Sequence, residues 1–253
     1  MKYTDLIFDL YGTLVDIHTD ETDRVWQECA SFFAPYGLNI SGDGLKKRFQ
    51  DEIKLRESKE GQNYECYPDI PFDEVLTVLL KREGVEIAQS IVEDGAWRFR
   101  QKSTEYIRLY PHMREALERL RELGCRLWLL SNAQRVFTTG ELEMLGIYDL
   151  FDGVYLSSNY GCRKPDKRFY ESLICDHNLD VKRCVMIGND RDTDIAGAKA
   201  LGMATLYMHT ALTPAEQSKA DDKLHPDRAD GIHFEYEGDD WKDLAPLIEK
   251  ICK

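Results

Sequence analysis

The apolar and polar positions divide the first half of the chain into one short strand and a long helical block. The apolar run Asp5–Asp9 stops shortly before Gly12, a pattern typical of a buried strand followed by a tight turn. From about residue 19 to residue 104 the segments are long and polar on one side, which predicts helices. The expected helices are Glu21–Phe33, Leu45–Ser58, Phe72–Arg82 and Ala88–Tyr106.

Strands and helices alternate after Pro111. Met113–Leu123 carries apolar residues at helical spacing, and Gly124 follows it as a C-terminal stop. The expected strands are Arg126–Leu130, Val154–Leu156, Cys184–Ile187, Ala204–Tyr207 and an edge strand at Ala229–Phe234. The expected helices are Thr139–Leu145, Asp166–His177, Thr193–Leu201 and Trp241–Ile251. This alternation predicts right-handed crossovers and a doubly wound parallel sheet of the α/β, Rossmann-like class.

The helical block is expected to be a cap inserted after the first strand, because that strand belongs to the same sheet as the later ones. The expected core domain comprises residues 1–17 and 107–253, and the expected cap domain comprises residues 18–106. A chain of 253 residues is long enough for this organisation.

Composition and charge narrow the range of partners. The net charge of −13 argues against general affinity for nucleic acid or for anionic membranes, and no apolar run is long enough to span a membrane. The chain carries no secretory signal pattern, and its seven cysteines are scattered singly, so we expect a cytoplasmic protein with reduced thiols. A small anionic substrate remains compatible with this composition if a local cluster of positive groups binds it. The sequence makes no prediction of oligomeric state.

Polar or ionisable side chains follow four of the predicted strands. The four segments are Asp9–Leu14, Ser131-Asn132, Arg163–Pro165 and Gly188–Asp194. Turn and capping preferences explain any one of them singly. Because ligands bind beyond the carboxyl ends of parallel strands, the four together predict one catalytic site at that edge of the sheet.

These four segments resemble the motifs of the haloacid dehalogenase superfamily. They comprise Asp-x-x-Gly-Thr at Asp9–Thr13, the strand ending in Ser131, the Lys164-Pro165 pair and the acidic Gly-Asn-Asp…Asp segment that ends at Asp194. The resemblance covers nearly the whole chain, and the position of the cap is similar to that of the family's helical (C1) cap type. It implies a hydrolase that forms a covalent ester on Asp9.

The resemblance implies a role for each of these residues. The carboxylate of Asp9 attacks phosphorus or carbon to give an intermediate that water then splits. Thr13 offers a hydroxyl to an oxyanion, and Ser131, with backbone N–H groups near Asn132, binds the oxygens of the transferring group. Lys164 supplies a positive charge to both the nucleophile and the substrate. The expected catalytic residues are therefore Asp9, Thr13, Ser131 and Lys164, and the expected substrate-binding residues are Ser131, Asn132 and Lys164.

The acidic segment predicts a magnesium site. Asp190 and Asp194 supply hard oxygen ligands, and with Asp9 and the backbone carbonyl of Tyr11 they are suited to hold one Mg²⁺. We expect Asp190 to be the direct ligand. Asp194 is expected to support the site, to cap the following helix or to orient Lys164.

Tyr11 departs from the pattern of the family's phosphatases, which carry a second aspartate at this position as general acid and base. A phenol is a poor base near neutral pH, and loss of general acid–base help costs ~10²–10⁴ in rate. Asp-x-Tyr-Gly-Thr is instead similar to the first motif of the 2-haloacid dehalogenases, whose halide leaves without a proton. Asp190 argues against that activity, because a metal-free dehalogenase has no use for its negative charge beside the nucleophile.

The leading hypothesis is therefore a Mg²⁺-dependent phosphoryl-transfer hydrolase that acts on a small phosphorylated metabolite. One alternative is a 2-haloacid dehalogenase, with Arg48 or Arg56 of the cap as a halide-binding candidate. Another is a catalytically weak member that binds a phosphometabolite or a partner. Candidates for lining the space under the cap are Tyr64, Tyr67, Trp97, Arg98, Arg100 and Lys102. We expect no metal site among His209, His225 and His233, whose spacing is irregular.

Overall fold

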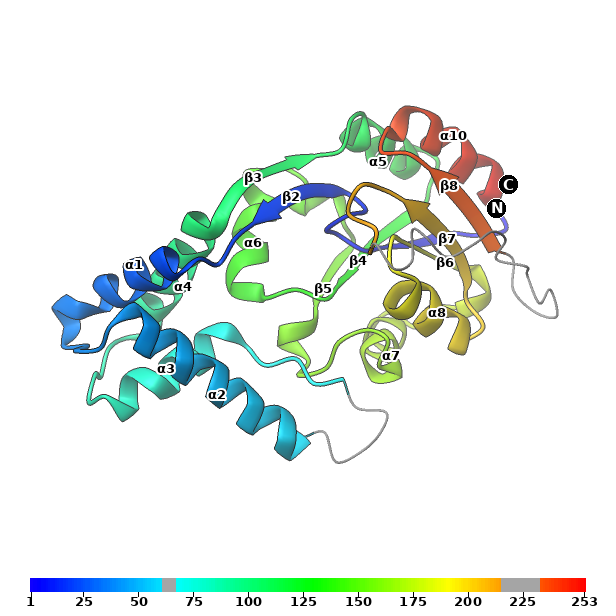
Figure 1. The fold of residues 1–253 in the computed structure, drawn as a ribbon. Helices are drawn as coiled ribbons and strands as arrows, with labels where there is room; N and C mark the ends of the chain where they lie inside the picture. Colours follow the sequence, from blue (N-terminus) through cyan, green and yellow to red (C-terminus); the bar gives the residue numbers. More distant parts are fainter. Residues whose placement is uncertain (61–66, 215–232) are drawn as a thin grey trace.

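The computed structural model describes residues 1–60, 67–214 and 233–253. Figure 1 shows an α/β core and a helical cap beside it. Within the described residues, no helix is long and apolar enough to cross a membrane.

The core is built on a six-stranded parallel sheet in the order β5-β4-β1-β6-β7-β8. Its strands are β1 (Asp5–Phe8), β4 (Arg126–Ser131), β5 (Gly153–Leu156), β6 (Cys184–Gly188), β7 (Ala204–His209) and β8 (His233–Glu237). The chain runs from β1 to β4 and β5 on one side, and then to β6, β7 and β8 on the other. The residue after β1 therefore lies at the point where the winding reverses, which is where α/β sheets bind ligands.

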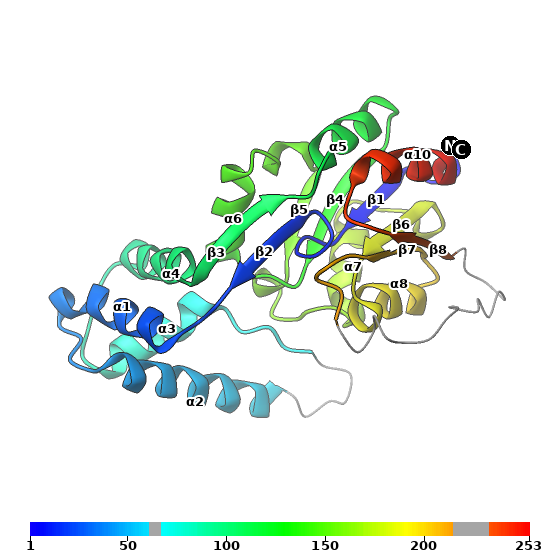
Figure 2. The ribbon, with the colours of Figure 1, turned by 45° about the horizontal axis from the view of Figure 1, so that its top comes forward.

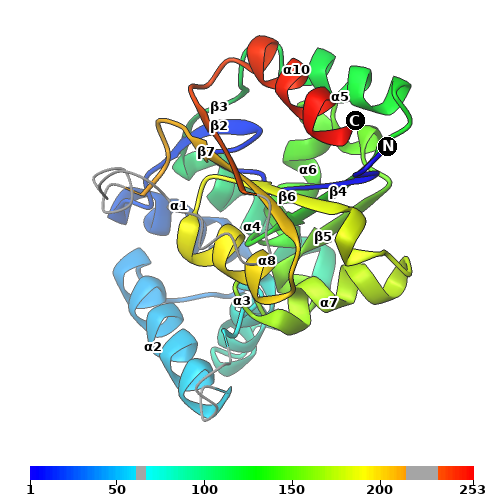
Figure 3. The same cartoon turned by 90° about the vertical axis from the view of Figure 1, so that its right-hand side faces the viewer.

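Helices cover both faces of this sheet (Figure 3). Leu6 and Phe8 of β1 face a cluster that includes side chains of α5 (Met113–Glu122) and α10 (Trp241–Cys252). Ile7 faces the opposite cluster, with side chains of α7 (Lys167–Asp176) and α8 (Ala196–Ala200). Successive strand residues point to opposite faces, so β1 is buried along its whole length. The expected doubly wound core is confirmed.

The cap consists of α1 (Asp23–Phe33), α2 (Gly42–Glu60), α3 (Phe72–Arg82) and α4 (Gln89–Ser103). These helices enclose their own apolar cluster, in which Trp26, Phe72 and Phe99 pack together. Phe137 of the core helix α6 (Arg135–Met144) enters this cluster, with its ring centroid 5.0 Å from that of Phe72. The cap therefore packs directly against α6.

An antiparallel ribbon of two strands, β2 (Val15–Thr19) and β3 (Thr104–Leu109), connects the core to the cap (Figure 2). The sequence analysis missed this ribbon, and its helix prediction for Ala88–Tyr106 is wrong at the C-terminal end, because α4 ends at Ser103. Thr104 and Ile107 are β-branched and pair with β2, so strand pairing overrides the helical pattern there.

Smaller differences concern where other elements begin and end. Helix α6 begins at Arg135, four residues before the expected start, and a π-helical turn (Arg191–Ile195) precedes α8. Strand β8 begins at His233, and residues 229–232 of the expected edge strand lie outside the described residues. Short 3₁₀ turns lie at Ala34–Tyr36, Tyr148–Leu150, Ser157–Asn159 and Val181–Arg183.

Candidate active site

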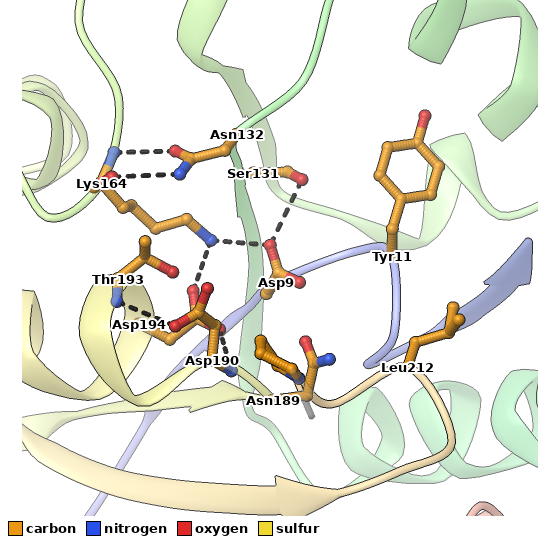
Figure 4. A pocket seen from close by; sticks show the side chains of 11 residues that line it. Asp9, Tyr11, Ser131, Asn132, Lys164, Asn189, Asp190, Thr193, Asp194 and Leu212 are labelled. Carbon is orange, nitrogen blue, oxygen red and sulfur yellow. Dashed lines mark hydrogen bonds and ion pairs between the residues drawn. The ribbon is translucent and has the colours of Figure 1, made fainter. Parts of the chain in front are cut away.

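Asp9 is the first residue after β1, and its side chain lies at the centre of a polar network (Figure 4). Its Oδ1 accepts hydrogen bonds from Lys164 Nζ at 2.7 Å and from Ser131 Oγ at 3.3 Å. Thr13 Oγ1 lies 3.4 Å from the other carboxylate oxygen. The residue is only 8% exposed, and its carboxylate is bound by groups from its own turn, from the end of β4 and from the loop that contains Lys164.

The turn after Asp9 is held from both sides. Gly12 has a φ of +84°, and a Cβ there would lie 2.3 Å from Nδ2 of Asn189, so the position requires glycine. Thr210 Oγ1 donates to the carbonyl of Gly12 at 2.6 Å, and Trp241 Nε1 donates to the carbonyl of Thr13 at 3.2 Å. The sequence analysis missed Thr210 and Trp241, because nothing in their local sequence signals a contact with so distant a turn.

Lys164 is buried between two carboxylates. Its Nζ donates to Asp9 at 2.7 Å, to the carbonyl of Leu130 at 2.7 Å and to Asp194 at 2.6 Å. Burial alone would lower the pKa of Lys164, but the charges of Asp194 and Asp9 outweigh it and raise that pKa. Lys164 is therefore a permanent cation beside Asp9.

The side chain of Asn132 orients Lys164. Its Oδ1 accepts from the backbone N–H of Lys164 at 2.7 Å, and its Nδ2 donates to the carbonyl of the same residue at 3.1 Å. Asn132 also lines the cavity beside Asp9, where the sequence analysis expects it to contact a substrate.

The two aspartates of the acidic loop have different environments. Asp190 Oδ1 accepts the backbone N–H groups of Asp192 at 2.8 Å and Thr193 at 3.2 Å, which caps the turn. Asp194 is 1% exposed, and its second oxygen accepts the N–H of Asp190 at 3.1 Å. Burial raises the pKa of Asp194. The charge of Lys164 acts to lower that pKa, and the charge of Asp9 acts to raise it further. Asp194 is therefore the more deeply buried of the two, and both residues line the cavity at this edge of the sheet.

A cavity of about 200 Å³ opens at this edge of the sheet. The structure brings together there nearly all the residues that the sequence analysis selected, and Thr13 lies just behind them. The cavity is lined by Asp9, Tyr11, Ser131, Asn132, Lys164, Asn189, Asp190, Thr193, Asp194, Leu212 and Pro214.

Tyr11 extends away from Asp9 (Figure 4). Its hydroxyl donates to the carboxylate of Glu141 on α6 and lies 2.9 Å from Thr138 Oγ1. Arg100 of the cap binds Glu141 through Nε at 2.6 Å and lies over the Tyr11 ring, 5.5 Å from its centroid. Burial, and then the charge of Glu141, raises the pKa of Tyr11, so the phenol stays protonated near neutral pH.

The family model of the haloacid dehalogenase-like hydrolases matches residues 6–202, which include the cap and all four strand-end segments. The chain belongs to this family. The membership agrees with the geometry of the site, because Ser131 and Lys164 come from different strand ends and both bind the carboxylate of Asp9.

Relatives of this hydrolase include both phosphatases and a haloacid dehalogenase. The chain is 30% identical to a glyceraldehyde 3-phosphate phosphatase of Methanothermobacter thermautotrophicus, over 84% of this chain and 88% of the relative. It is 27% identical to the (S)-2-haloacid dehalogenase 2 of a Pseudomonas species, over 84% of this chain and 86% of the relative.

Solved structures share the fold of this hydrolase. A 2-haloacid dehalogenase of Pseudomonas syringae matches with a TM-score of 0.64 at 19% identity, over 98% of this chain and 99% of that chain. A HAD hydrolase of Bacillus subtilis, solved with bound magnesium, matches with a TM-score of 0.54 at 19% identity, over 98% and 100% of the two chains.

The donor chemistry of the cavity suits a small hard cation. The described part of the chain holds no cluster of three or more His, Cys, Asp or Glu side chains arranged to bind a metal. Mg²⁺ does not require such a cluster, since it commonly binds one or two carboxylates, several waters and a substrate phosphate. Asp9 and Asp190 supply two carboxylates on the walls of one cavity, so these residues fit the ion.

Most of the cap candidates lie away from Asp9. Arg48 pairs with Glu83, and Arg56 pairs with Glu52 and Glu74, so neither halide candidate lines the cavity that contains Asp9. The remaining candidates contact cap or core residues. Arg98 lies over Phe32, and Lys102 pairs with Glu28. Trp97 packs beside Gly140, and the carbonyl of Tyr67 accepts a hydrogen bond from the N–H of Arg163. Tyr64 and His225 lie outside the described residues.

Among the cap candidates that the structure describes, Arg100 reaches the site. It lines a second cavity of about 460 Å³ between cap and core, whose wall shares Tyr11 and Asn132 with the first. Asp69 and Arg163 also line this second cavity. The two cavities therefore adjoin each other at Tyr11 and Asn132.

Proposed function

We propose that this protein is a Mg²⁺-dependent phosphoryl-transfer hydrolase that acts on a small phosphorylated metabolite through an aspartyl phosphate on Asp9. The observation that carries the proposal is the buried Asp9–Lys164–Asp194 cluster beside a cavity that Asp190 also lines. The relationship to archaeal glyceraldehyde 3-phosphate phosphatases supports a phosphatase reaction.

In this reaction the carboxylate of Asp9 attacks phosphorus, the bond to the leaving group breaks, and water then splits the resulting acyl phosphate. Lys164 keeps Asp9 ionised and places a positive charge beside the transferring group. Ser131 and Thr13 orient the carboxylate through their hydroxyls. Asp9 and Asp190, with the carbonyl of Tyr11, would hold Mg²⁺. The bound ion supplies charge that offsets the repulsion between the carboxylate and an anionic phosphoryl group.

Phosphate release from a panel of phosphorylated metabolites, measured with Mg²⁺ and with EDTA, tests the proposal. We expect release that requires Mg²⁺ and is abolished by Asp9→Asn. Asp190→Asn should raise the Mg²⁺ concentration needed, whereas Asp192→Asn, an exposed position on the same turn, serves as the matched control. Release that is unaffected by EDTA and by Asp9→Asn would contradict the proposal.

Haloacid dehalogenation is the second candidate. The observation that favours it is the orientation of Tyr11, whose hydroxyl is bound to Glu141 and is not available to protonate a leaving group. A halide needs no proton, and a Pseudomonas dehalogenase is among the relatives. Halide release from 2-haloacids in the presence of EDTA would support this activity, and its absence alongside Mg²⁺-dependent phosphate release would exclude it.

A further inference from the structure

Lys164 has no hydrogen left to donate to a leaving group. An ammonium group carries three N–H donors. Those of Lys164 bind Asp9, the carbonyl of Leu130 and Asp194 at 2.6 to 2.7 Å. The residue lends charge to the site, but a proton transfer from it would break one of these three buried bonds.

The hydroxyl of Tyr11 is committed as well. It donates to Glu141, and Arg100 holds Glu141 from the other side at 2.6 Å. The ring lies beneath the Arg100 guanidinium, which prevents it from turning towards Asp9 without breaking contact with the cap. Figure 4 shows the hydroxyl pointing away from the Asp9 carboxylate.

The remaining polar groups around the two cavities offer no better donor among the described residues. Ser131 and Thr13 direct their hydroxyls at Asp9. Both carboxylate oxygens of Asp69 accept hydrogen bonds, one from Ser157 Oγ and the other from Gln134 Nε2 at 2.9 Å. Glu21 is an exposed carboxyl group that also lines the second cavity, so the experiment tests it as an alternative acid.

We propose that the enzyme acts on phosphoryl compounds whose leaving groups depart as stable anions without a proton, namely acyl phosphates, phosphoanhydrides and aryl phosphates. This inference rests on the proposed phosphatase function and specifies its substrate class. It separates the protein from a phosphatase of alkyl phosphates, such as the glyceraldehyde 3-phosphate named for its archaeal relative.

The chemical step balances without an acid. A bond forms between Asp9 oxygen and phosphorus, the bond between phosphorus and the leaving oxygen breaks, and that oxygen keeps the electron pair as a carboxylate, phosphate or phenolate. Water then attacks the phosphorus of the aspartyl phosphate. Asp9 leaves as a carboxylate, which needs no proton, and the water's proton passes to solvent.

The test is the dependence of kcat/KM on leaving-group basicity, measured with aryl phosphates of graded phenol basicity, acetyl phosphate and an alkyl phosphate. Since general acid catalysis is worth ~10²–10⁴, we expect kcat/KM to fall at least ~10²-fold across the aryl series and to be lowest for the alkyl phosphate. Tyr11→Phe and Glu21→Gln should show equally steep dependence, whatever their absolute rates.

A shallow dependence in the wild-type enzyme would overturn the inference and leave the phosphatase function intact. If that shallow dependence became steep in Tyr11→Phe or in Glu21→Gln, the altered residue would be identified as the proton donor. No Mg²⁺-dependent phosphate release from any substrate, acetyl phosphate included, would overturn the proposed function and the inference with it.

Discussion

At the scale of single residues, Lys164 matters for stability as much as for chemistry. Lys164→Met removes the cation between Asp9 and Asp194 and leaves two buried carboxylates without compensation. Removing one partner of a buried ion pair costs about 3–5 kcal/mol, so we expect a loss of that size in the free energy of unfolding, measured in urea at pH 7.

Lys167→Met is the matched control, because Lys167 is exposed and pairs with Glu171 on the surface. Its expected effect lies within about 0.5 kcal/mol. Equal losses in the two variants would contradict the structural role that we assign to Lys164.

The nucleophile, its cation and the acidic loop were predictable from the sequence, because each follows a strand and the carboxyl ends of parallel strands meet. The groups that orient them were not. Glu141 and Thr138 lie in the middle of a helix, and Trp241 begins another, so only the packing of these helices shows which atoms they bind.

At the scale of elements, Asp166 connects the Lys164 loop to helix α7. Its side chain caps the helix through the N–H of Arg168 at 3.0 Å and also binds the Arg168 side chain. Burial alone would raise the pKa of Asp166, but these hydrogen bonds outweigh burial and lower that pKa. A carboxyl group with a lowered pKa stabilises the fold above its unfolded-state pKa, and this contribution is lost as the pH falls through the folded-state value.

Asp166→Asn tests this dependence on pH, because asparagine is a comparable cap without the charge. We expect the variant to be less stable at pH 7 by under about 1 kcal/mol, since the Arg168 side chain is exposed to solvent. The difference should shrink below about pH 4, near the unfolded-state pKa of aspartate. Urea unfolding at several pH values measures it, and a difference that stays constant down to pH 3 would contradict the assignment.

The type of most elements could be predicted from periodicity, but the connecting ribbon could not. Val15–Thr19 and Thr104–Leu109 are short, and each is stable only when paired with the other across the cap insertion. A pattern that is read along the chain contains no information on such a pairing, which is why Thr104–Tyr106 was assigned to a helix.

At the scale of the whole molecule, the cap and the core are joined by a charged contact that also binds the side chain of Tyr11. Arg100 of the cap is 15% exposed in its side chain, and Glu141 of the core is 3% exposed. Glu141→Gln leaves Arg100 without its anionic partner and weakens the contact with Tyr11. We expect a loss of up to about 3–5 kcal/mol in thermal or urea unfolding.

Glu143→Gln, an exposed position on the same helix, should change the stability by no more than about 0.5 kcal/mol. A Glu141→Gln variant as stable as Glu143→Gln would show that the Arg100–Glu141 pair does not join the cap to the core.

The parallel sheet and the helical cap were predictable at this scale, because the strand–helix alternation begins after residue 111 and the first strand joins the same sheet. The docking of the cap on α6 was not, since the expected helix began at Thr139 and did not include Phe137. The structure instead places it in the apolar cluster of the cap.

The most direct test of the central claim is detection of the covalent intermediate. The protein is mixed with acetyl phosphate and Mg²⁺ and quenched in acid, and its peptides are analysed by mass spectrometry. The account predicts one added phosphoryl group on Asp9, and none with EDTA or in Asp9→Asn. Sustained phosphate release without a phosphorylated Asp9, at the same rate in Asp9→Asn, would contradict it.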